Sequence, residues 1–253
     1  MEYAHLSSTV AAKTISEDAT AGVFEIEGLY AGYGLTLGNA LRRTLLSSLP
    51  GAAVTYIKVK NASHEFSTLP GMKEDLIELL LNFKKLRFRM DVDEPQVLTL
   101  SVKGERVVTA ADIETTTQAQ IVNPDVELAT LTAKDATLDI EITVERGLGY
   151  SPAESRKAEK LPIGVIAVDA FFSPVTAVNY TAENMRVGDR TDYNRLRLEI
   201  MTDGTVSPSS ALHKAGNILK DHFEKAGAVE VKTFEASEAA AAPKKRSKKE
   251  KAS

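Results

Sequence analysis

Three glycines ahead of an expected helix are the residues that could hold a nucleotide phosphate. Gly32, Gly34 and Gly38 give the spacing G-x-G-x-x-x-G. This spacing is one residue longer than the dinucleotide-binding fingerprint, and the segment lacks the lysine of a P-loop. We interpret the glycines as a tight turn that leads the chain into a helix.

Acidic and imidazole side chains offer weak metal sites. Asp91, Asp93 and Glu94 could ligate a divalent cation, but alternating carboxylates at a strand end are more typical of a solvated sheet edge. His213 and His222 lie nine residues apart, so they do not share the one-turn spacing of paired zinc ligands. No serine or cysteine stands in a recognisable nucleophile pattern. The residues favour an interaction protein over an enzyme, and a metal-dependent enzyme is the weakest interpretation.

Two neighbouring arginines mark a possible binding surface. Leu46 lies between the directions of Arg42 and Arg43 on an expected helix, away from the main leucine stripe. Most surface arginines are simply solvated, but an arginine beside a leucine that needs cover is typical of an interface.

The composition is that of a folded protein without disulfides. The 253 residues are 43% hydrophobic and 26% charged, and there is no cysteine. No window approaches the roughly 18 to 20 apolar residues of a membrane helix, and Met1 to Val10 has neither a basic flank nor an apolar run. We expect a cytoplasmic protein with no membrane partner.

The charge is unevenly distributed. In residues 243–253, six basic residues against Glu250 give +5, so the remainder of a chain with net charge −4 carries −9. An acidic body repels phosphate backbones, so DNA contact is expected only weakly, through this basic segment. The alanine- and lysine-rich residues 229–253 are expected to form a disordered tail.

The helices that position these groups are recognised by their apolar stripes. A first helix is predicted over 38–49, ending at Pro50-Gly51. A second follows Pro70-Gly71, with Glu74 and Asp75 in its first turn and Lys84-Lys85 at its end. Its predicted buried face consists of Leu76, Leu79, Leu80 and Phe83.

The last helix is predicted over 208–226, with Ser207 as N-cap and Pro208 at the first helical position, ending at Gly227. Its expected inward residues are Leu212, Ala215, Leu219, Phe223 and Ala226.

Between the helices the sequence predicts antiparallel strands. Residues 87–147 have period two, most clearly from Leu138 to Glu145. Residues 147–162 are expected to form a loop, 163–170 a short apolar strand, and 196–200 a strand ending at the turn Asp203-Gly204.

The run from Gly34 to Gly51, GLTLGNALRRTLLSSLPG, resembles the signature of bacterial and plastid RNA polymerase α subunits. Further matches follow in family order: 64–68, 74–82, 107–112, 145–150, 162–164, 168–175 and 190–192. The resemblance covers nearly all of residues 15–228.

The resemblance implies an α+β fold in two domains. Residues 1–50 and 177–228 would form a dimerisation domain of helices on an antiparallel sheet, and 51–176 an inserted, mostly β domain. The first and last helices would make the homodimer contact. The stripes assign this contact to Leu37, Leu41, Leu45, Leu212, Leu219 and Phe223.

The resemblance also implies partners. The dimer would be the platform on which the β and β′ subunits assemble, with ω in the complete enzyme. The catalytic site, with the Mg and Zn of the holoenzyme, would lie in the large subunits, leaving this chain without catalytic residues or cofactors. Contacts with the large subunits would map onto Arg43, Leu46, Glu78, Lys84, Val168, Asp169 and Ser173.

Family members usually continue into a small helical domain that binds promoter DNA. The sequence ends at Ser253, so we expect the form reduced to its assembly domain. The alternative is a stand-alone dimeric DNA-binding regulator that uses the basic tail. Lysines alone would give it sequence-blind attraction, without a helix that reads bases.

Overall fold

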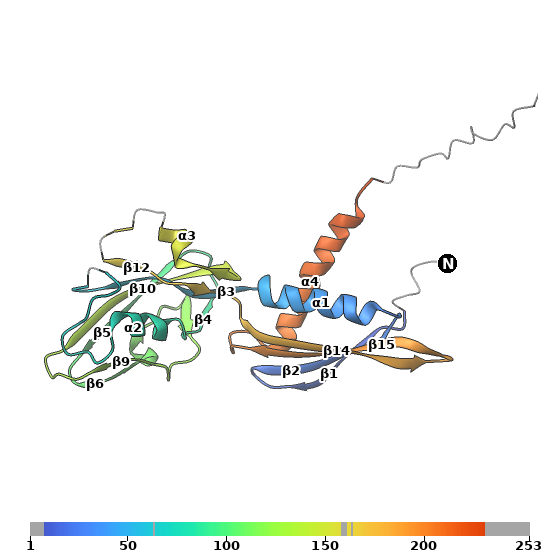
Figure 1. Cartoon of the computed structure of the whole chain (residues 1–253), viewed down its shortest axis with the longest axis horizontal. Helices are drawn as coiled ribbons and strands as arrows, with labels where there is room; N and C mark the ends of the chain where they lie inside the picture. The colour runs from blue at the N-terminus through green and yellow to red at the C-terminus, as the bar shows by residue number, and fades with distance from the viewer. Residues whose placement is uncertain (1–7, 63, 158–160, 163, 231–253) are drawn as a thin grey trace, which may run out of the picture.

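The computed structural model describes residues 8–62, 64–157, 161–162 and 164–230. They are built around two main sheets with separate hydrophobic cores that lie side by side (Figure 1). We call them the small-sheet unit and the large-sheet unit.

The small-sheet unit is a four-stranded antiparallel sheet covered by two helices. Its strand order is β1 (Ala11–Glu17), β2 (Ala21–Leu29), β15 (Arg190–Thr202) and β14 (Val175–Val187). Helix α1 (Tyr33–Ser47) packs on β14 and β15, and α4 (Pro208–Gly227) crosses α1 (Figure 1). The first and last parts of the chain therefore build one unit together.

Helix α1 begins at Tyr33, five residues earlier than predicted, and ends at Ser47. Only Gly32, with a φ of 86°, forms the predicted turn. Gly34 and Gly38 lie inside the helix, where a Cβ atom on Gly38 would stand 2.5 Å from Tyr180 Cδ2. Glycine costs about 1 kcal/mol in a helix, and the close approach of the helix to the sheet explains why it is used here.

The large-sheet unit contains a seven-stranded sheet and the second helix. The main path of the sheet is β7 (Ile113–Glu114), β5 (Gln96–Lys103), β10 (Thr137–Leu148), β3 (Pro50–Val59), β4 (Phe88–Met90) and β8 (Ala119–Ile121), and β12 (Val165–Ala167) pairs with β3. Smaller pairs are β6 (Arg106–Thr109) with β9 (Glu127–Leu131) and β11 (Tyr150–Ser151) with β13 (Ala170–Phe171). Short helical turns are η2 (Ala110–Asp112) and α3 (Ala153–Lys157).

Helix α2 (Leu76–Phe83) confirms the predicted second helix and its buried face, of which Leu80 is only half-buried. Asp75 is the N-cap, and its carboxylate accepts from the Glu78 N–H at 2.7 Å. Glu74 lies before the helix rather than in its first turn, and its carboxylate accepts from the Thr130 N–H at 2.7 Å.

Strand β10 confirms the predicted alternation, with Leu138, Ile140, Ile142 and Val144 buried. The predicted loop 147–162 is wrong in part, because it contains the end of β10, β11 and α3. The predicted strand 163–170 is split between β12 and β13. The interruption occurs where the Val168 N–H donates to Thr55 O and Asp169 turns to accept from Ala153 N–H.

Strand β15 and its turn at Asp203-Gly204 are confirmed, as is the Ser207 N-cap of α4, which accepts from the Ser210 N–H. The predicted inward face of α4 holds only for its first half. Ala215 is buried and Leu212 and Leu219 are half-buried, but every residue from Lys220 to Gly227 is exposed. The face continues past the end of the sheet, so Phe223 and Ala226 pack against none of the residues that the structure describes.

Where the structure describes the chain, no helix is long and apolar enough to cross a membrane. Except for Val229 and Glu230, the predicted tail 229–253 lies outside the described residues.

Candidate functional site: a docking surface

The charged centre of the candidate site is the pair Lys84 and Asp169. Lys84 Nζ lies 3.0 Å from Asp169 Oδ2 and 5.7 Å from the centre of the Phe171 ring. The other Asp169 oxygen accepts from the Ala153 N–H at 2.9 Å. The hydrogen bond from Ala153, followed by that from Lys84, holds the pKa of Asp169 below its usual value. Two residues predicted separately as partner contacts are thus a single preorganised group.

A shallow apolar pocket adjoins this pair. It measures about 290 Å³ and lies between α2 and the segment that carries Val168. Phe66 and Leu81, at its rim, are 72% and 52% exposed. Glu78 is exposed on α2, one turn before Leu81. Exposed apolar side chains around a charged group are typical of a surface that binds another protein.

The two arginines of α1 differ in their surroundings. Arg42 Nε donates to Val178 O at 3.1 Å, so its side chain ties α1 to β14. Arg43 is exposed, and within the described residues its side chain has no hydrogen bond or ion pair. Leu46 is half-buried against the small-sheet core. Arg43 is therefore available to a partner, whereas Arg42 is committed to the fold.

The end of α1 is continuous with the charged centre. A Cβ atom on Gly149 would stand 3.4 Å from Ser47 O, and the next residue, Tyr150, packs its ring 4.6 Å from that of Phe171. Phe171 in turn lies under Lys84. Ser173, whose hydroxyl donates to Val175 O at 3.3 Å, follows on the same segment.

We call this face the docking surface. It comprises the seven predicted contact residues, Arg43, Leu46, Glu78, Lys84, Val168, Asp169 and Ser173, together with the exposed residues Phe66, Leu81, Tyr150 and Phe171. Of the seven, Val168 is buried in the core of the large-sheet unit and only lines the floor of the pocket. All four added residues, Phe66, Leu81, Tyr150 and Phe171, stand within the matched sequence runs. The presence of large apolar side chains in those runs could have identified these four residues from the sequence.

The residues predicted for the dimer contact are not all at the surface. Leu41 and Leu45 are buried in the core of their own unit and Leu37 is half-buried against it, because the leucine stripe of α1 packs on β14 and β15. Phe223, 64% exposed on the outer half of α4, is the one of the six that is fully available. Leu35 on α1, 62% exposed, was not predicted.

The candidate metal residues are separated in space or already engaged. Asp93 pairs with Arg146 at 2.7 Å, and His222 Nδ1 lies 2.7 Å from Ile218 O. In the described ranges, no three residues of the kinds that bind metals gather at one point.

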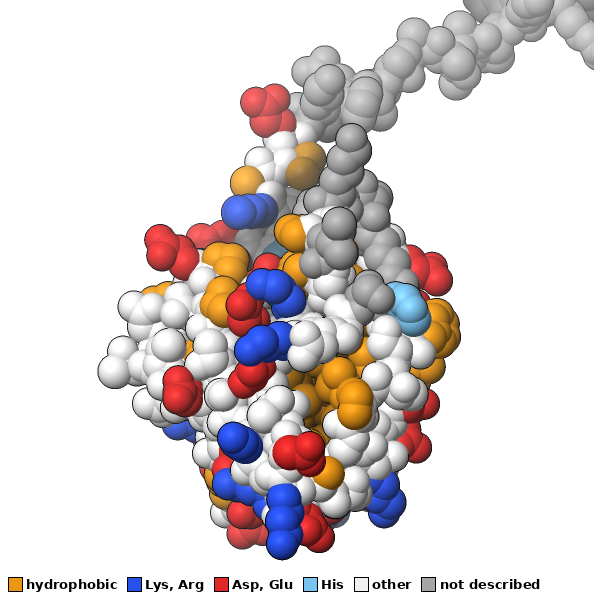
Figure 2. All heavy atoms as spheres, turned by 90° about the vertical axis from the view of Figure 1, so that its left-hand side faces the viewer, with side chains coloured by type: hydrophobic (Ala, Val, Ile, Leu, Met, Phe, Trp, Pro, Cys, Tyr) orange, Lys and Arg blue, Asp and Glu red, His pale blue; other side chains and the backbone are white. Residues whose placement is uncertain are grey.

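The end of the large-sheet unit carries charges of both signs. Figure 2 shows acidic and basic side chains interspersed there, with hydrophobic side chains gathered in a patch among them. Such a face produces no uniform positive field toward a phosphate backbone.

Comparison with known proteins agrees with this architecture. Residues 56–173 match the family described as RNA polymerase Rpb3/RpoA insert domain. This match covers the large-sheet unit from within β3 to the end of β13 and its following residues, so that unit is similar to the RNA polymerase insert domain.

Relatives extend the match to the small-sheet unit. DNA-directed RNA polymerase subunit alpha of Symbiobacterium thermophilum is 52% identical over 210 residues, which are 83% of this chain and 66% of the relative. The corresponding subunits of Alkaliphilus oremlandii and Roseiflexus sp. are 48% and 51% identical, over 83% and 80% of this chain and 66% and 62% of the relatives. The chain belongs to the family of DNA-directed RNA polymerase α subunits. It spans slightly less than two thirds of the length of these relatives.

Proposed function

We propose that the chain is a scaffold on which the β and β′ subunits of a DNA-directed RNA polymerase assemble. The observation that carries the proposal is the continuity of the docking surface. Lys84 after α2 and Asp169 after β12 form one charged group beside the exposed rings of Tyr150 and Phe171. The end of α1, which carries Arg43 one turn before Ser47, adjoins this group at Gly149. Arginine and aromatic side chains around a partly apolar pocket are the usual anchors of a protein interface.

The scaffold works as a homodimer in this proposal. Residues 1–50 and 177–228 form its dimerisation domain, and residues 51–176 form the inserted domain. The outer half of α4, with Phe223 exposed, extends beyond the sheet of its own chain (Figure 1). Two copies related by a two-fold axis would cover each other's helices, as isologous packing requires.

The chemistry of transcription belongs to the other subunits in this proposal. Nucleotide transfer, with the Mg and Zn of the complete enzyme, takes place in the large subunits, and ω joins the assembly. This chain positions the two large subunits relative to each other in the cytoplasm. The large subunits contact the DNA, and this chain contributes only a weak contact through its basic segment 243–253.

Co-purification tests the proposal. The tagged chain is expressed with its cognate β and β′ subunits, and the complexes are sized by light scattering. We expect a dimer alone, and a complex with one copy of each large subunit when all are present. A chain that purifies without either large subunit would refute the scaffold function, and a monomer would refute the dimer.

A further inference from the structure

The docking surface is divided between the two units, so its shape depends on how they are held. Arg43 and Leu46 belong to the small-sheet unit, and Lys84 and Asp169 to the large-sheet unit. The chain passes between the units twice, once after Leu49 and once between β13 and β14. The inference below rests on the function proposed above.

The two passages lie against each other. A Cβ atom on Gly51 would stand 1.9 Å from Phe172 O, so the two backbones touch. Ala53, Ala170 and Phe172 form a small hydrophobic cluster at this point. The start of β3 and the segment between β13 and β14 lie side by side and define one line of connection, about which the units could rotate. Fixing their angle requires a further contact away from that line.

A tight turn of the small-sheet unit provides this contact. Asp203 is largely buried, and its Oδ2 lies 3.6 Å from Arg87 Nε of the large-sheet unit. Its Oδ1 accepts from the backbone N–H and hydroxyl of Thr205, at 2.9 and 2.5 Å. The carboxylate is thus fixed within its own turn before it meets the arginine.

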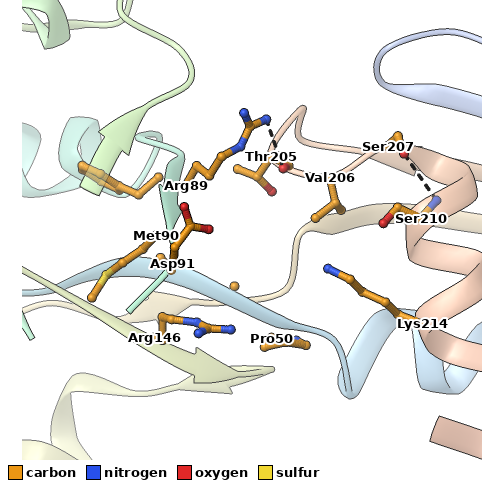
Figure 3. Close-up of a pocket in the computed structure, with 13 residues that line it drawn as sticks. Pro50, Arg89, Met90, Asp91, Arg146, Thr205, Val206, Ser207, Ser210 and Lys214 are labelled. Atoms are coloured by element: carbon orange, nitrogen blue, oxygen red, sulfur yellow. Dashed lines mark hydrogen bonds between the residues drawn. The ribbon is translucent and has the colours of Figure 1, made fainter. Parts of the chain in front are cut away.

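A second arginine reaches the same turn. Arg89 Nη2 donates to Thr205 O at 3.3 Å and approaches Gly204 O at 3.5 Å, as Figure 3 shows for Thr205. Gly204 has a φ of 87°, and a Cβ atom there would stand 3.4 Å from Val122 Cγ1 of the large-sheet unit. The turn therefore fits closely against two arginines and a valine.

Below this contact the units are separated by a cleft. Its volume is about 350 Å³, and its lining includes Met90 and Arg146 from one unit and Val206 and Lys214 from the other (Figure 3). Because a cleft rather than a continuous hydrophobic core lies between the units here, the polar contacts of the turn are well placed to set the angle between the units.

These contacts also lead directly to the docking surface. Arg87 Nη1 donates to Lys84 O at 3.1 Å, and Lys84 is the residue that pairs with Asp169. A guanidinium held by Asp203 of one unit thus supports the backbone beneath the charged centre in the other.

We propose that Arg87, Arg89, Asp203 and Thr205 form an interunit clamp that holds the two units at the angle at which the docking surface is continuous. These are positioning residues: they touch no partner and act through the placement of Arg43 and Lys84. Loss of these contacts leaves each docking residue in place within its own unit. The docking residues of the small-sheet unit are then no longer held at a fixed position relative to those of the large-sheet unit.

Distance measurements test the clamp independently of partner binding. The chain has no cysteine, so Asp125→Cys and Asp189→Cys, both exposed and in different units, place two spin labels at defined sites. Labelled chain is diluted into unlabelled chain, and the distance distribution is measured by double electron–electron resonance in the parent protein and in R87M/R89M. Capture of the β subunit is titrated with the same proteins.

Arg146→Met is the matched control. Arg146 lines the same cleft, but its ion pair with Asp93 lies within the large-sheet unit. We expect R87M/R89M to broaden the distance distribution and to weaken β capture roughly tenfold, which corresponds to a coupling of about 1.4 kcal/mol. The control should retain the parent distribution.

The outcomes separate the clamp from the scaffold function. An unchanged distribution in R87M/R89M, or a broadened one with β capture at the parent level, overturns the clamp. Failure of the parent protein to capture β overturns the scaffold function instead, because the distance measurement does not depend on it. Circular dichroism establishes that both variants are folded, and a second variant, Asp203→Ala, must broaden the distribution in the same way.

Discussion

Lys84 and Asp169, 85 residues apart in sequence, form an ion pair of 3.0 Å that joins the end of α2 to the segment after β12. Asp169 also accepts from the Ala153 N–H, so one carboxylate connects three segments. The pair is partly exposed, and surface ion pairs contribute little to stability. Its consequence is geometric, because it fixes the shape of a surface that a partner must match.

The contribution of the charged Asp169 carboxylate should be visible in the pH dependence of stability. The pKa of Asp169 is lowered from its ordinary value of 3.8, so its charged form stabilises the folded state. That contribution is complete above the unfolded value and is lost as the pH falls through the lower folded value. Asp169→Asn should therefore be less stable than the parent at pH 6, and the difference should shrink below about pH 4. Urea unfolding at several pH values measures it, and a difference that stays constant would contradict the assignment.

Substitution of two adjacent arginines should affect two different properties, the capture of β in one case and folding stability in the other. Arg43→Ala should weaken β capture by about 2 kcal/mol or more and leave the dimer and its unfolding midpoint unchanged, because Arg43 has no partner among the described residues. Arg42→Ala should instead lower stability by about 1 kcal/mol, through loss of its bond to Val178 O, and leave capture intact. Titration of β against both variants and urea unfolding of both variants distinguish the two roles. Equal effects on capture would remove Arg43 from the docking surface.

Leu41 and Phe223 should behave differently although both were predicted for the dimer contact. Leu41 is buried within its own chain, so Leu41→Ala should cost about 2 to 5 kcal/mol of stability. Phe223 is exposed, so Phe223→Asp should leave the fold intact and give monomers, by placing a charge in the proposed contact between copies. Light scattering with circular dichroism measures both properties. A folded dimer of Phe223→Asp would show that the outer half of α4 is not at the interface.

Two helical glycines form a matched pair. Gly38→Ala should destabilise the chain by about 1 to 3 kcal/mol, since the added methyl group would meet Tyr180 and Leu196. Gly216→Ala in α4 adds its methyl group to open space and should stabilise by up to about 1 kcal/mol through helix propensity. Urea unfolding of the two variants gives the comparison, and stabilisation by both would show that α1 does not need its close approach to the sheet.

The basic segment should contribute a salt-sensitive attraction to DNA in the assembled polymerase. Its charge of +5 predicts that log affinity falls with log salt by a slope of about −4 to −5 relative to a chain ending at Ala242. Titrations of upstream promoter DNA at several salt concentrations measure the slope. Equal affinities and slopes would leave the segment without a DNA role.

Local signals in the sequence were sufficient to predict the features that depend only on residues nearby in the chain. The face of α2, the alternation of β10 and the cap at Ser207 depend on neighbours a few residues away, and all were predicted. The start of α1 was missed because Gly34 and Gly38 read as a turn until the sheet beneath them is known.

Long-range packing decided the rest. Periodicity shows that the Leu41 stripe is covered, but not whether its own sheet or a second copy covers it; the structure places it on its own sheet. The resemblance supplied the predicted contact residues separately, whereas the pairing of Lys84 with Asp169 depends on the path of the whole large-sheet unit.

The outer half of α4 has a further consequence for a chain that has not met its partners. Residues Lys220 to Gly227 are helical but exposed throughout. Helical turns without tertiary contacts are marginal in water. In an unpaired copy this end of α4 is therefore accessible, and it should open more readily than the first half of the helix, which packs on the sheet. The local stability of residues 220–227 would then depend on whether a partner covers them. A protease would therefore cleave single copies in preference to assembled ones.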